Sequence, residues 1–474
     1  MKPWLSVIIF GALLYFNAHA QPIDLGISLR TMAATKNHLP FWFIVNQAGA
    51  VDKTSANSLA SVHISRVLNP NNRISFSFGL DFIGRLSDHK QAYFHQLYGA
   101  VRYGKFFVRV GRREQMVGLV DSTLSIGSMT LSRNATPVPM VGIGFDYIPV
   151  LSLPGKVDLI YAKGFFGHGW LGNDRFVRGA YLHEKYLYLR AFGPPEFPVH
   201  AYGGLVHFVI WGGTHPKLGR LPSGLGDLIN VALAQAGDPG RANFGEVINA
   251  LGNTVASYDF GLTVKTGPID ARAYRQFYIE TSPAVRFRNP WDGLWGVSIR
   301  FPDIRFPISA FLWEHVNTKK QGAKHNEGEF NGADNYYNNF LYKGGWTYEG
   351  QVLGLPLIFG NGKQPGVVNN IIVAHHFAIE GILPHQVKYT TFVTYSRNYG
   401  ARDDCNDNGC SGNTTLRTSR RDQYSFLLKI SAPLVPHRGI DLDAAISFDT
   451  GSVYPENAGA MLGIRWNVAK KSVR

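Results

Sequence analysis

The chain is poor in long apolar runs. A membrane-crossing helix needs about 20 consecutive apolar residues. The longest apolar stretch past the N-terminal leader, Gly204 to Gly213, falls well short of that length. The sequence therefore excludes a helical membrane span in the body of the protein.

Motifs of familiar catalytic centres are missing as well. The sequence has no HExxH zinc motif, no GxSxG nucleophile elbow and no P-loop. His375 and His376 lie within one predicted strand, where adjacent side chains point to opposite faces, so they cannot share a metal ion. We predict no catalytic residue, no metal ion and no cofactor. An outer-membrane hydrolase stays a third alternative, because spacing along strands does not show which Ser, His and Asp side chains meet.

Charged residues are also few, at 17% of the 474 residues, but their balance is basic. The 47 Lys and Arg residues outnumber the 33 Asp and Glu residues and give a formal net charge of +14. Such a charge favours an acidic partner, for example lipopolysaccharide or an anionic polysaccharide.

Residues 1–20 have the pattern of a secretory signal peptide. Lys2 supplies the positive start, Leu5 to Phe16 an apolar core, and Ala18-His19-Ala20 a small-residue cleavage site before Gln21. We therefore expect export, with residues 21–474 forming one mature domain. Export disfavours a nucleic acid partner.

Cysteine is limited to Cys405 and Cys410, in a polar loop from Asn398 to Arg421. An exported protein meets an oxidising compartment, and the four residues between the two cysteines allow a tight loop. The pattern predicts a disulfide. A calcium site built from acidic residues of the same loop, Asp403, Asp404 and Asp407, is the weaker alternative.

What the chain does contain is strict alternation of apolar and polar residues. In the stretch from Tyr93 to Arg113, Leu97 and Val101 share one face while Tyr98 and Arg102 share the other, and a tight turn at 103–105 starts a second strand. Strands of about ten residues with one apolar and one basic face suit a barrel wall between lipid and a wet lumen. The pattern recurs at 74–82, 141–147, 157–161, 258–265, 426–430, 441–448 and 460–468. We predict an all-β fold, a transmembrane antiparallel β-barrel, in the outer membrane.

One region changes to helical spacing. Leu225, Ile229 and Leu233 recur every four residues, and Asn243 with Glu246 resembles a capping box. We expect a small helical hairpin over about 223–252, packed against one mouth of the barrel.

Two long loops, 164–178 and 319–346, mix aromatic with polar residues. Sugar rings stack on aromatic faces, and their hydroxyls bind Asn, Asp and Arg. These loops are the candidate glycan-binding site, although barrel loops and aromatic girdles are generally rich in the same residue types. The candidate residues are Trp170, Arg175, Arg178, Asp334, Asn335, Tyr336, Tyr337 and Trp346.

Several short motifs, taken in order, resemble a known family. They are LPFWF at 39–43 with Asn46-Gln47, QLYG at 96–99 with GRR at 111–113, and GADNYYNN at 332–339 leading to GWTY at 345–348. This order is similar to the capsule assembly Wzi family, in the form found in Bacteroidetes-type bacteria. The resemblance covers essentially the whole mature chain, and no single motif is a chemical signature.

That resemblance implies an eighteen-stranded outer-membrane barrel with a helical element, acting as a lectin for capsular or extracellular polysaccharide. It supplies no catalytic residues. One departure is that the chain ends eight residues beyond Trp466, whereas many outer-membrane proteins end on an aromatic. The main alternative function is a passive porin, which needs an open constriction where a lectin needs a closed lumen.

Overall fold

The computed structural model describes residues 23–155, 157–194, 196–302, 307–322, 334–360, 366–401, 405–406, 409–410 and 419–468. The predicted signal peptide lies outside these residues.

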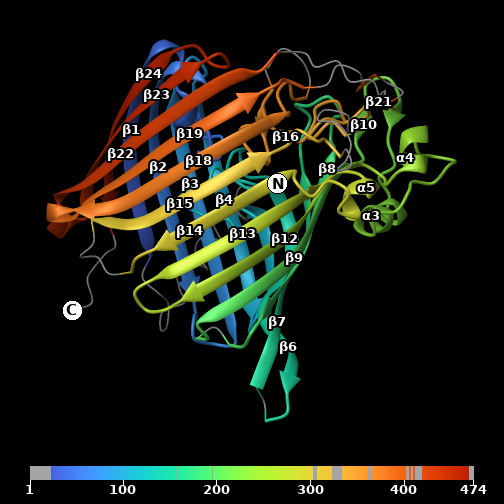
Figure 1. Ribbon diagram of the computed structural model, residues 1–474, viewed down its shortest axis with the longest axis horizontal. Coiled ribbons are helices and arrows are strands. Elements are labelled where there is room, and N and C mark those ends of the chain that lie inside the picture. The colour runs from blue at the N-terminus through green and yellow to red at the C-terminus, as the bar shows by residue number, and fades with distance from the viewer. Residues whose placement is uncertain are drawn as a thin grey trace, which may run out of the picture.

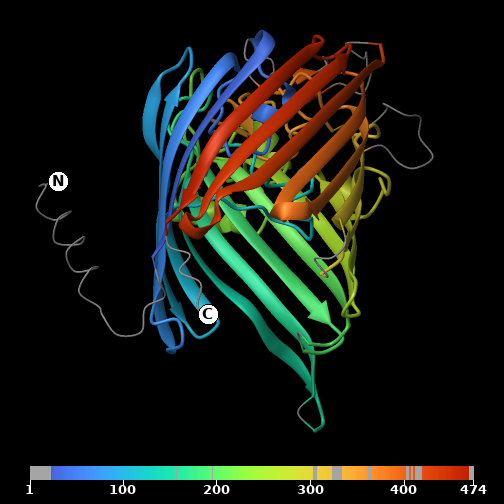
Figure 2. The same ribbon diagram turned by 90° about the vertical axis from the view of Figure 1, so that its left-hand side faces the viewer.

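Eighteen strands form one antiparallel sheet that closes on itself (Figures 1 and 2). β1 (Asp24–His38) pairs with β2 (Thr54–Leu68) on one side and with β24 (Asn457–Asn467) on the other, and the second pairing closes the barrel. The predicted fold class is confirmed. The remaining wall strands are β3 Ile74–Leu86, β4 Gln91–Tyr103, β5 Phe106–Arg112, β6 Pro139–Leu153, β7 Val157–Trp170, β8 Tyr181–Ala191, β9 Val199–Trp211, β12 Asn253–Lys265, β13 Asp270–Ile279, β14 Gly293–Arg300, β15 Ile308–Asn317, β18 Ile372–Leu383, β19 Val387–Asn398, β22 Arg421–Val435 and β23 Ile440–Gly451.

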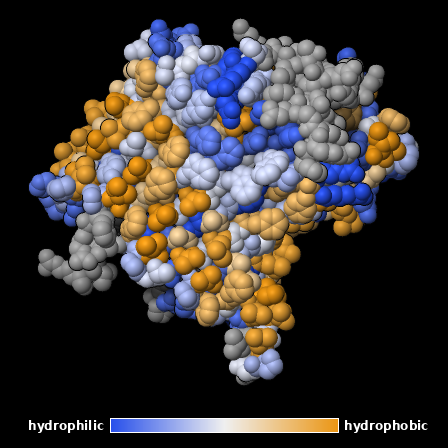
Figure 3. Space-filling model, in the orientation of Figure 1, coloured by the Kyte–Doolittle hydropathy of each residue, from blue (hydrophilic) through white to orange (hydrophobic). Residues whose placement is uncertain are grey.

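The hairpin of β4 and β5 shows how alternation builds the wall. Leu97, Val101 and Val110 point outward and are between 46% and 52% exposed, while Arg102 and Arg109, at positions of opposite parity, face the lumen. Apolar side chains cover much of the wall on the face seen in Figure 3. An apolar outer band with a polar interior is the surface that a lipid bilayer requires.

The two ends of the barrel differ in loop length. At one end the strands are joined by short connections such as 69–73, 104–105 and 266–269, and this end also holds the start of β1 and the end of β24. At the other end the connections are long, and the longest span 113–138, 212–252 and 318–371. We call these the short-turn end and the long-loop end.

Three long-loop connections fold back into the lumen and pack on one another. We call them the plug: residues 39–53, residues 113–138, and the described residues 334–360 and 366–371. Backbone hydrogen bonds join them, from Ala48 N to Arg133 O (2.7 Å) and from Ser132 N to Leu353 O (2.8 Å). Their apolar side chains form one continuous core with inward-facing wall residues. The plug includes helix α2 (Phe41–Ile44) and the short strands β16 (Thr347–Tyr348) and β17 (Gln351–Val352).

The predicted helical hairpin is present at the long-loop end, on the outer side of the wall. Helices α3 (Leu225–Ala232) and α4 (Phe244–Ile248) lie in the β9–β12 connection (Figure 1). Val231 and Leu251 pack on Val209 and Trp211, which belong to the outward face of β9.

The helices and strands outside the barrel wall are all short. No helix among the described residues is long and apolar enough to cross a membrane. The remaining elements are α5 Ser282–Val285, the short strands β10 Thr214–His215, β11 Gly219–Arg220, β20 Cys405–Asn406 and β21 Gly409–Cys410, and the 3₁₀ turns η1 Pro384–Gln386 and η2 Pro436–Arg438.

Candidate functional site

Buried polar side chains of the wall hold the plug in place. The Glu314 carboxylate on β15 accepts hydrogen bonds from Ser125 Oγ (2.6 Å), from the Ile126 backbone N–H (2.8 Å) and from Tyr274 Oη (2.6 Å). On β13, Gln276 Oε1 accepts from the Met129 backbone N–H (2.9 Å). Glu314 and Gln276 thus accept hydrogen bonds from donors of the plug that would otherwise be buried without a partner.

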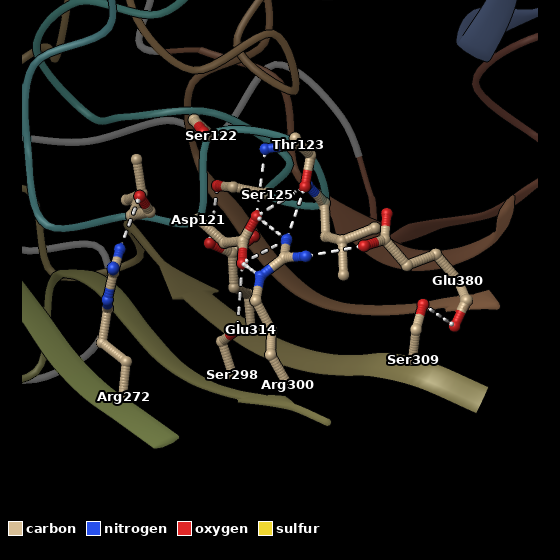
Figure 4. Close-up of polar contacts among 12 residues, drawn as sticks. Asp121, Ser122, Thr123, Ser125, Arg272, Ser298, Arg300, Ser309, Glu314 and Glu380 are labelled. Carbon is tan, nitrogen blue, oxygen red and sulfur yellow. Dashed lines mark hydrogen bonds and ion pairs between the residues drawn. The ribbon is translucent and has the colours of Figure 1, made fainter. Parts of the chain in front are cut away.

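A second contact is charged (Figure 4). Arg300 on β14 donates to both carboxylate oxygens of Asp121 in the plug at 2.8 to 3.1 Å, and to Glu380 on β18 at 2.6 Å. Burial opposes ionisation of Asp121, but the Thr123 backbone N–H and the Arg300 guanidinium outweigh it and lower the pKa of Asp121 to about 2. The plug is therefore tied to the wall by an ionised carboxylate at any physiological pH.

The aromatic candidates of loop 319–346 belong to the interior of the plug. Tyr336, Tyr337 and Trp346 are fully buried. Trp346 Nε1 donates to the Thr130 carbonyl (2.8 Å), and the Tyr336 hydroxyl donates to Asp292 Oδ2 (2.9 Å). In this conformation they present no ring face to a ligand outside the barrel.

The two polar candidates beside them are also buried. Asp334 donates its backbone N–H to Gln321 O (2.9 Å). Asn335 Oδ1 accepts from Asn370 Nδ2 (2.6 Å) and Asn338 Nδ2 (3.1 Å). All five candidates between 334 and 346 therefore help to hold the plug together.

The candidates of the predicted loop 164–178 have different surroundings, and the predicted start of that loop is wrong because residues 164–170 pair within strand β7. Trp170, the last residue of β7, is 45% exposed and lies on the outward face opposite Tyr181, where an aromatic anchors a barrel at the membrane interface. Arg175 donates to Thr347 O (3.2 Å), and burial lowers its pKa to about 10. Arg178 is exposed and pairs through its backbone with Thr214. The structure thus brings Arg175 to the plug and leaves Trp170 on the lipid side.

The two cysteines of the predicted disulfide lie on two short strands. Strands β20 and β21 place Cys405 and Cys410 directly opposite each other. The disulfide itself stays a prediction. The acidic residues proposed as a calcium alternative, Asp403, Asp404 and Asp407, lie outside the described residues.

A cavity of about 490 Å³ lies in the lumen on the short-turn side of the plug. Arg102, Arg109, Arg113 and Lys163 line it, with Gln115, Met116 and Val117 of the plug above. The Arg102 guanidinium pairs with Asp146 (2.6 Å), and those of Arg113 and Arg109 lie over the rings of Tyr98 and Phe165 at 4.9 and 5.0 Å. Sequence reasoning found the basic face of the 93–113 hairpin but not the plug segment that turns this face into a cavity.

A closed, lipid-facing antiparallel barrel with a filled lumen defines the class: the protein is a plugged outer-membrane β-barrel. The model of the family described as capsule assembly protein Wzi matches residues 31–364. The chain therefore belongs to the Wzi capsule assembly family, as its motifs predicted.

Among solved structures, one match is Wzi of Escherichia coli, described as an outer membrane protein involved in group 1 capsule assembly and a carbohydrate-binding β-barrel. The identity is 14% and the TM-score 0.59, over 97% of this chain and 87% of that one, which shows a shared fold. OccK5 (OpdH) of Pseudomonas aeruginosa matches with 8% identity and a TM-score of 0.48, over 94% of this chain and 97% of that one. Among curated proteins no significant match is found.

Proposed function

We propose that the protein binds polysaccharide at the cell surface and holds it there during capsule or exopolysaccharide assembly. The observation that carries the proposal is the plug, in a chain whose family is the Wzi capsule assembly family. A surface lectin needs a closed, stable platform, whereas a passive porin needs an open constriction. Contacts such as those of Glu314 and Arg300 keep the platform in place.

We propose binding without catalysis. Three carboxylates in or against the plug, those of Asp121, Glu314 and Asp292, are each engaged by two or more donors of the protein. A general acid or base needs access to its substrate, and these groups are directed into plug contacts.

The accessible residues at the long-loop end are the proposed contact surface. Arg178 is exposed, and Arg112 donates to Tyr348 Oη (2.9 Å) and Glu349 Oε1 (3.2 Å) at the plug surface. Arg175 is largely buried behind them and donates to Thr347. Together with the basic net charge, the guanidinium groups of Arg178 and Arg112 favour an acidic polymer, since planar carboxylates accept paired hydrogen bonds from arginine.

The buried candidates have an indirect role in this proposal. Asp334, Asn335, Tyr336, Tyr337 and Trp346 shape the plug from beneath, and the polymer touches the surface that they support. Trp170 flanks that surface at the membrane boundary. Outer-membrane lipid, including lipopolysaccharide, is the second proposed partner because the outer wall is apolar and the chain basic.

The first prediction tests retention directly. A deletion strain should release surface polysaccharide into the medium, and the wild-type gene should restore retention. Arg178→Gln should restore it only in part. Each contact between one barrel and the polymer is weak, but the polymer binds many neighbouring barrels, so a small loss of affinity at each barrel is multiplied. Retention should also weaken as salt rises. The measurement is the ratio of cell-associated to released polysaccharide.

The matched control is Arg73→Gln, an exposed arginine at the short-turn end. It should restore retention fully. If the deletion strain keeps its polysaccharide, the proposed function is wrong. If Arg178→Gln and Arg73→Gln behave alike, the contact surface lies elsewhere.

A further inference from the structure

A groove lies on the outside of the wall, at the long-loop end of β13, β14 and β15. Its volume is about 490 Å³. Tyr274 and Gln276 face the lumen, where they hold Glu314 and the plug, so Arg275 between them faces outward. The groove is lined chiefly by aromatic side chains with one cation: Phe260, Trp291, Trp295, Trp313, Arg275 and His315.

Arg275 ties a loop down over this groove. Its guanidinium donates to the carbonyls of Pro290 (2.9 Å) and Asp292 (2.6 Å), and its Cζ lies 4.3 Å from the centre of the Trp295 ring. No carboxylate of the described residues lies within ion-pair distance of it. A cation on a lipid-facing wall is costly, and loop carbonyls and a ring face offset that cost here.

The loop that Arg275 holds, residues 280–292, supplies Trp291 to the groove and carries two more cations. Phe287 anchors the loop, with its ring 4.8 Å from that of Phe277 and 5.1 Å from that of Tyr258. Arg286 and Arg288 on either side are exposed, and neither makes an ion pair within the described part of the chain. Two exposed guanidinium groups therefore belong to the same loop as Trp291, which lines the apolar groove.

The neighbouring hairpin α3–α4 adds an apolar ridge on the same flank. Leu225, Ile229 and Leu233 follow one another at helical spacing, with Phe244 and Ile248 on α4, and all five are between 58% and 82% exposed. Figure 1 shows α3 and α4 on the outer flank of the barrel, on the same side as α5, and Figure 3 shows apolar surface on that flank. A short amphipathic helix with such a ridge suits the boundary between headgroups and acyl chains.

We propose that this flank binds an anionic lipid of the outer leaflet, of the phosphorylated lipopolysaccharide type. An acyl chain lies in the groove against Trp295 and Trp313, and the headgroup phosphates meet Arg286 and Arg288. Two observations select this occupant. The groove is continuous with the lipid-facing wall. The loop that supplies Trp291 to the groove also carries two exposed guanidinium groups, which bind phosphate through paired hydrogen bonds. The site is independent of polysaccharide retention at the plug surface.

The second prediction tests this site with the purified, detergent-solubilised barrel. Phosphorylated lipid A is compared with enzymatically dephosphorylated lipid A by native mass spectrometry. The wild type should bind the phosphorylated form more tightly. The double variant Arg286→Gln with Arg288→Gln should bind it roughly ten- to thirtyfold more weakly, because each of the two lost cations contributes a similar factor to the affinity for an anionic surface. Its affinity for the dephosphorylated form should equal that of the wild type.

Two further variants complete the design. Trp291→Ala, at the open edge of the groove, should weaken binding of both forms. The control Arg73→Gln with Lys105→Gln removes two exposed cations at the short-turn end and should bind as the wild type does. Equal binding of phosphorylated lipid A by the two double variants would overturn the site, and so would equal binding of both lipid forms by the wild type. Surface polysaccharide should stay attached in cells carrying the Arg286/Arg288 variant, which separates this proposal from the previous one.

Discussion

Glu280, the residue directly after β13, connects the wall to the aromatic part of the plug. Its Oε1 accepts from the Tyr337 backbone N–H (2.7 Å) and from the Tyr278 hydroxyl (2.9 Å). Burial, with the Asp334 carboxylate nearby, raises the pKa of Glu280 from 4.5 to about 8. The folded plug therefore favours the protonated form.

The third prediction follows from that pKa. Because the folded pKa lies above the unfolded one, the contribution of Glu280 is fully present below about pH 4.5 and is lost as pH rises towards 8. The loss is on the order of 1.4 kcal/mol for each pH unit crossed. Plug opening, measured as channel events in planar bilayers, should become more frequent between pH 6 and pH 8.

Glu280→Gln should remove this pH dependence, because a neutral amide oxygen accepts the same two hydrogen bonds without ionising. The exposed Glu456 offers the control, and Glu456→Gln should keep the wild-type profile. A profile that Glu280→Gln leaves unchanged would show that another group governs the opening.

Tyr336, Tyr337 and Trp346 mark the limit of reading a loop by composition. Aromatic and amide side chains serve a sugar-binding surface and a polar buried core equally well, since both need stacking and hydrogen bonds. The sequence singles these residues out by their side-chain types. Whether they are buried depends on the position of residues 125–134, which no local sequence pattern predicts.

The plug segment 113–138 is the element whose removal tells most about function. Its contacts reach across the chain, for example from Ser125 to Glu314, 189 residues away. Replacing residues 116–136 with a short Gly-Ser linker removes Asp121, Ser125 and Met129, and with them the partners of Arg300, Glu314 and Gln276.

The fourth prediction is that this replacement opens the lumen. Single-channel conductance and cellular uptake of large hydrophilic antibiotics should both rise, while the barrel still assembles, because the wall strands pair without the plug. Replacing residues 225–232 of helix α3 should leave conductance low, since that helix packs on the outward face of β9. A plug deletion that conducts no better than the wild type would mean that other segments alone seal the lumen.

Elements differ in how well sequence alone predicts them. The alternation of Leu97 and Val101 with Tyr98 and Arg102 is local and fixes which face meets lipid, so the wall is predictable. The hairpin at 223–252 is predictable for the same reason, from the spacing of Leu225. Residues 113–138 show neither the two-residue alternation of a strand nor the spacing of a helix. Their conformation is set by wall groups such as Glu314 that are distant in sequence.

The whole molecule behaves as one closed cylinder, and the fifth prediction concerns that closure. In a closed barrel each wall strand has hydrogen-bonded neighbours on both sides, so no edge is open to detergent. Unheated protein in dodecyl sulfate should migrate faster on gels than boiled protein, and it should fractionate with the outer membrane. Recovery in the soluble periplasmic fraction without detergent would contradict the barrel.

The seam between β1 and β24 has a consequence for the order of assembly. At this seam Thr35 donates its hydroxyl hydrogen to Asn457 Oδ1, 422 residues later in the chain. A chain delivered from its N-terminus must therefore keep β1 unpaired on one edge until the last strand arrives. Plug segment 113–138 must wait for its partners on β13 to β15, and segment 39–53 must wait for Asp449 on β23. Unpaired strand edges aggregate, so we expect a chaperone to hold the chain during this interval. A chain that stops before Asn457 carries every plug segment but has no seam, and we expect proteolysis to remove it before it ever becomes a leaky pore.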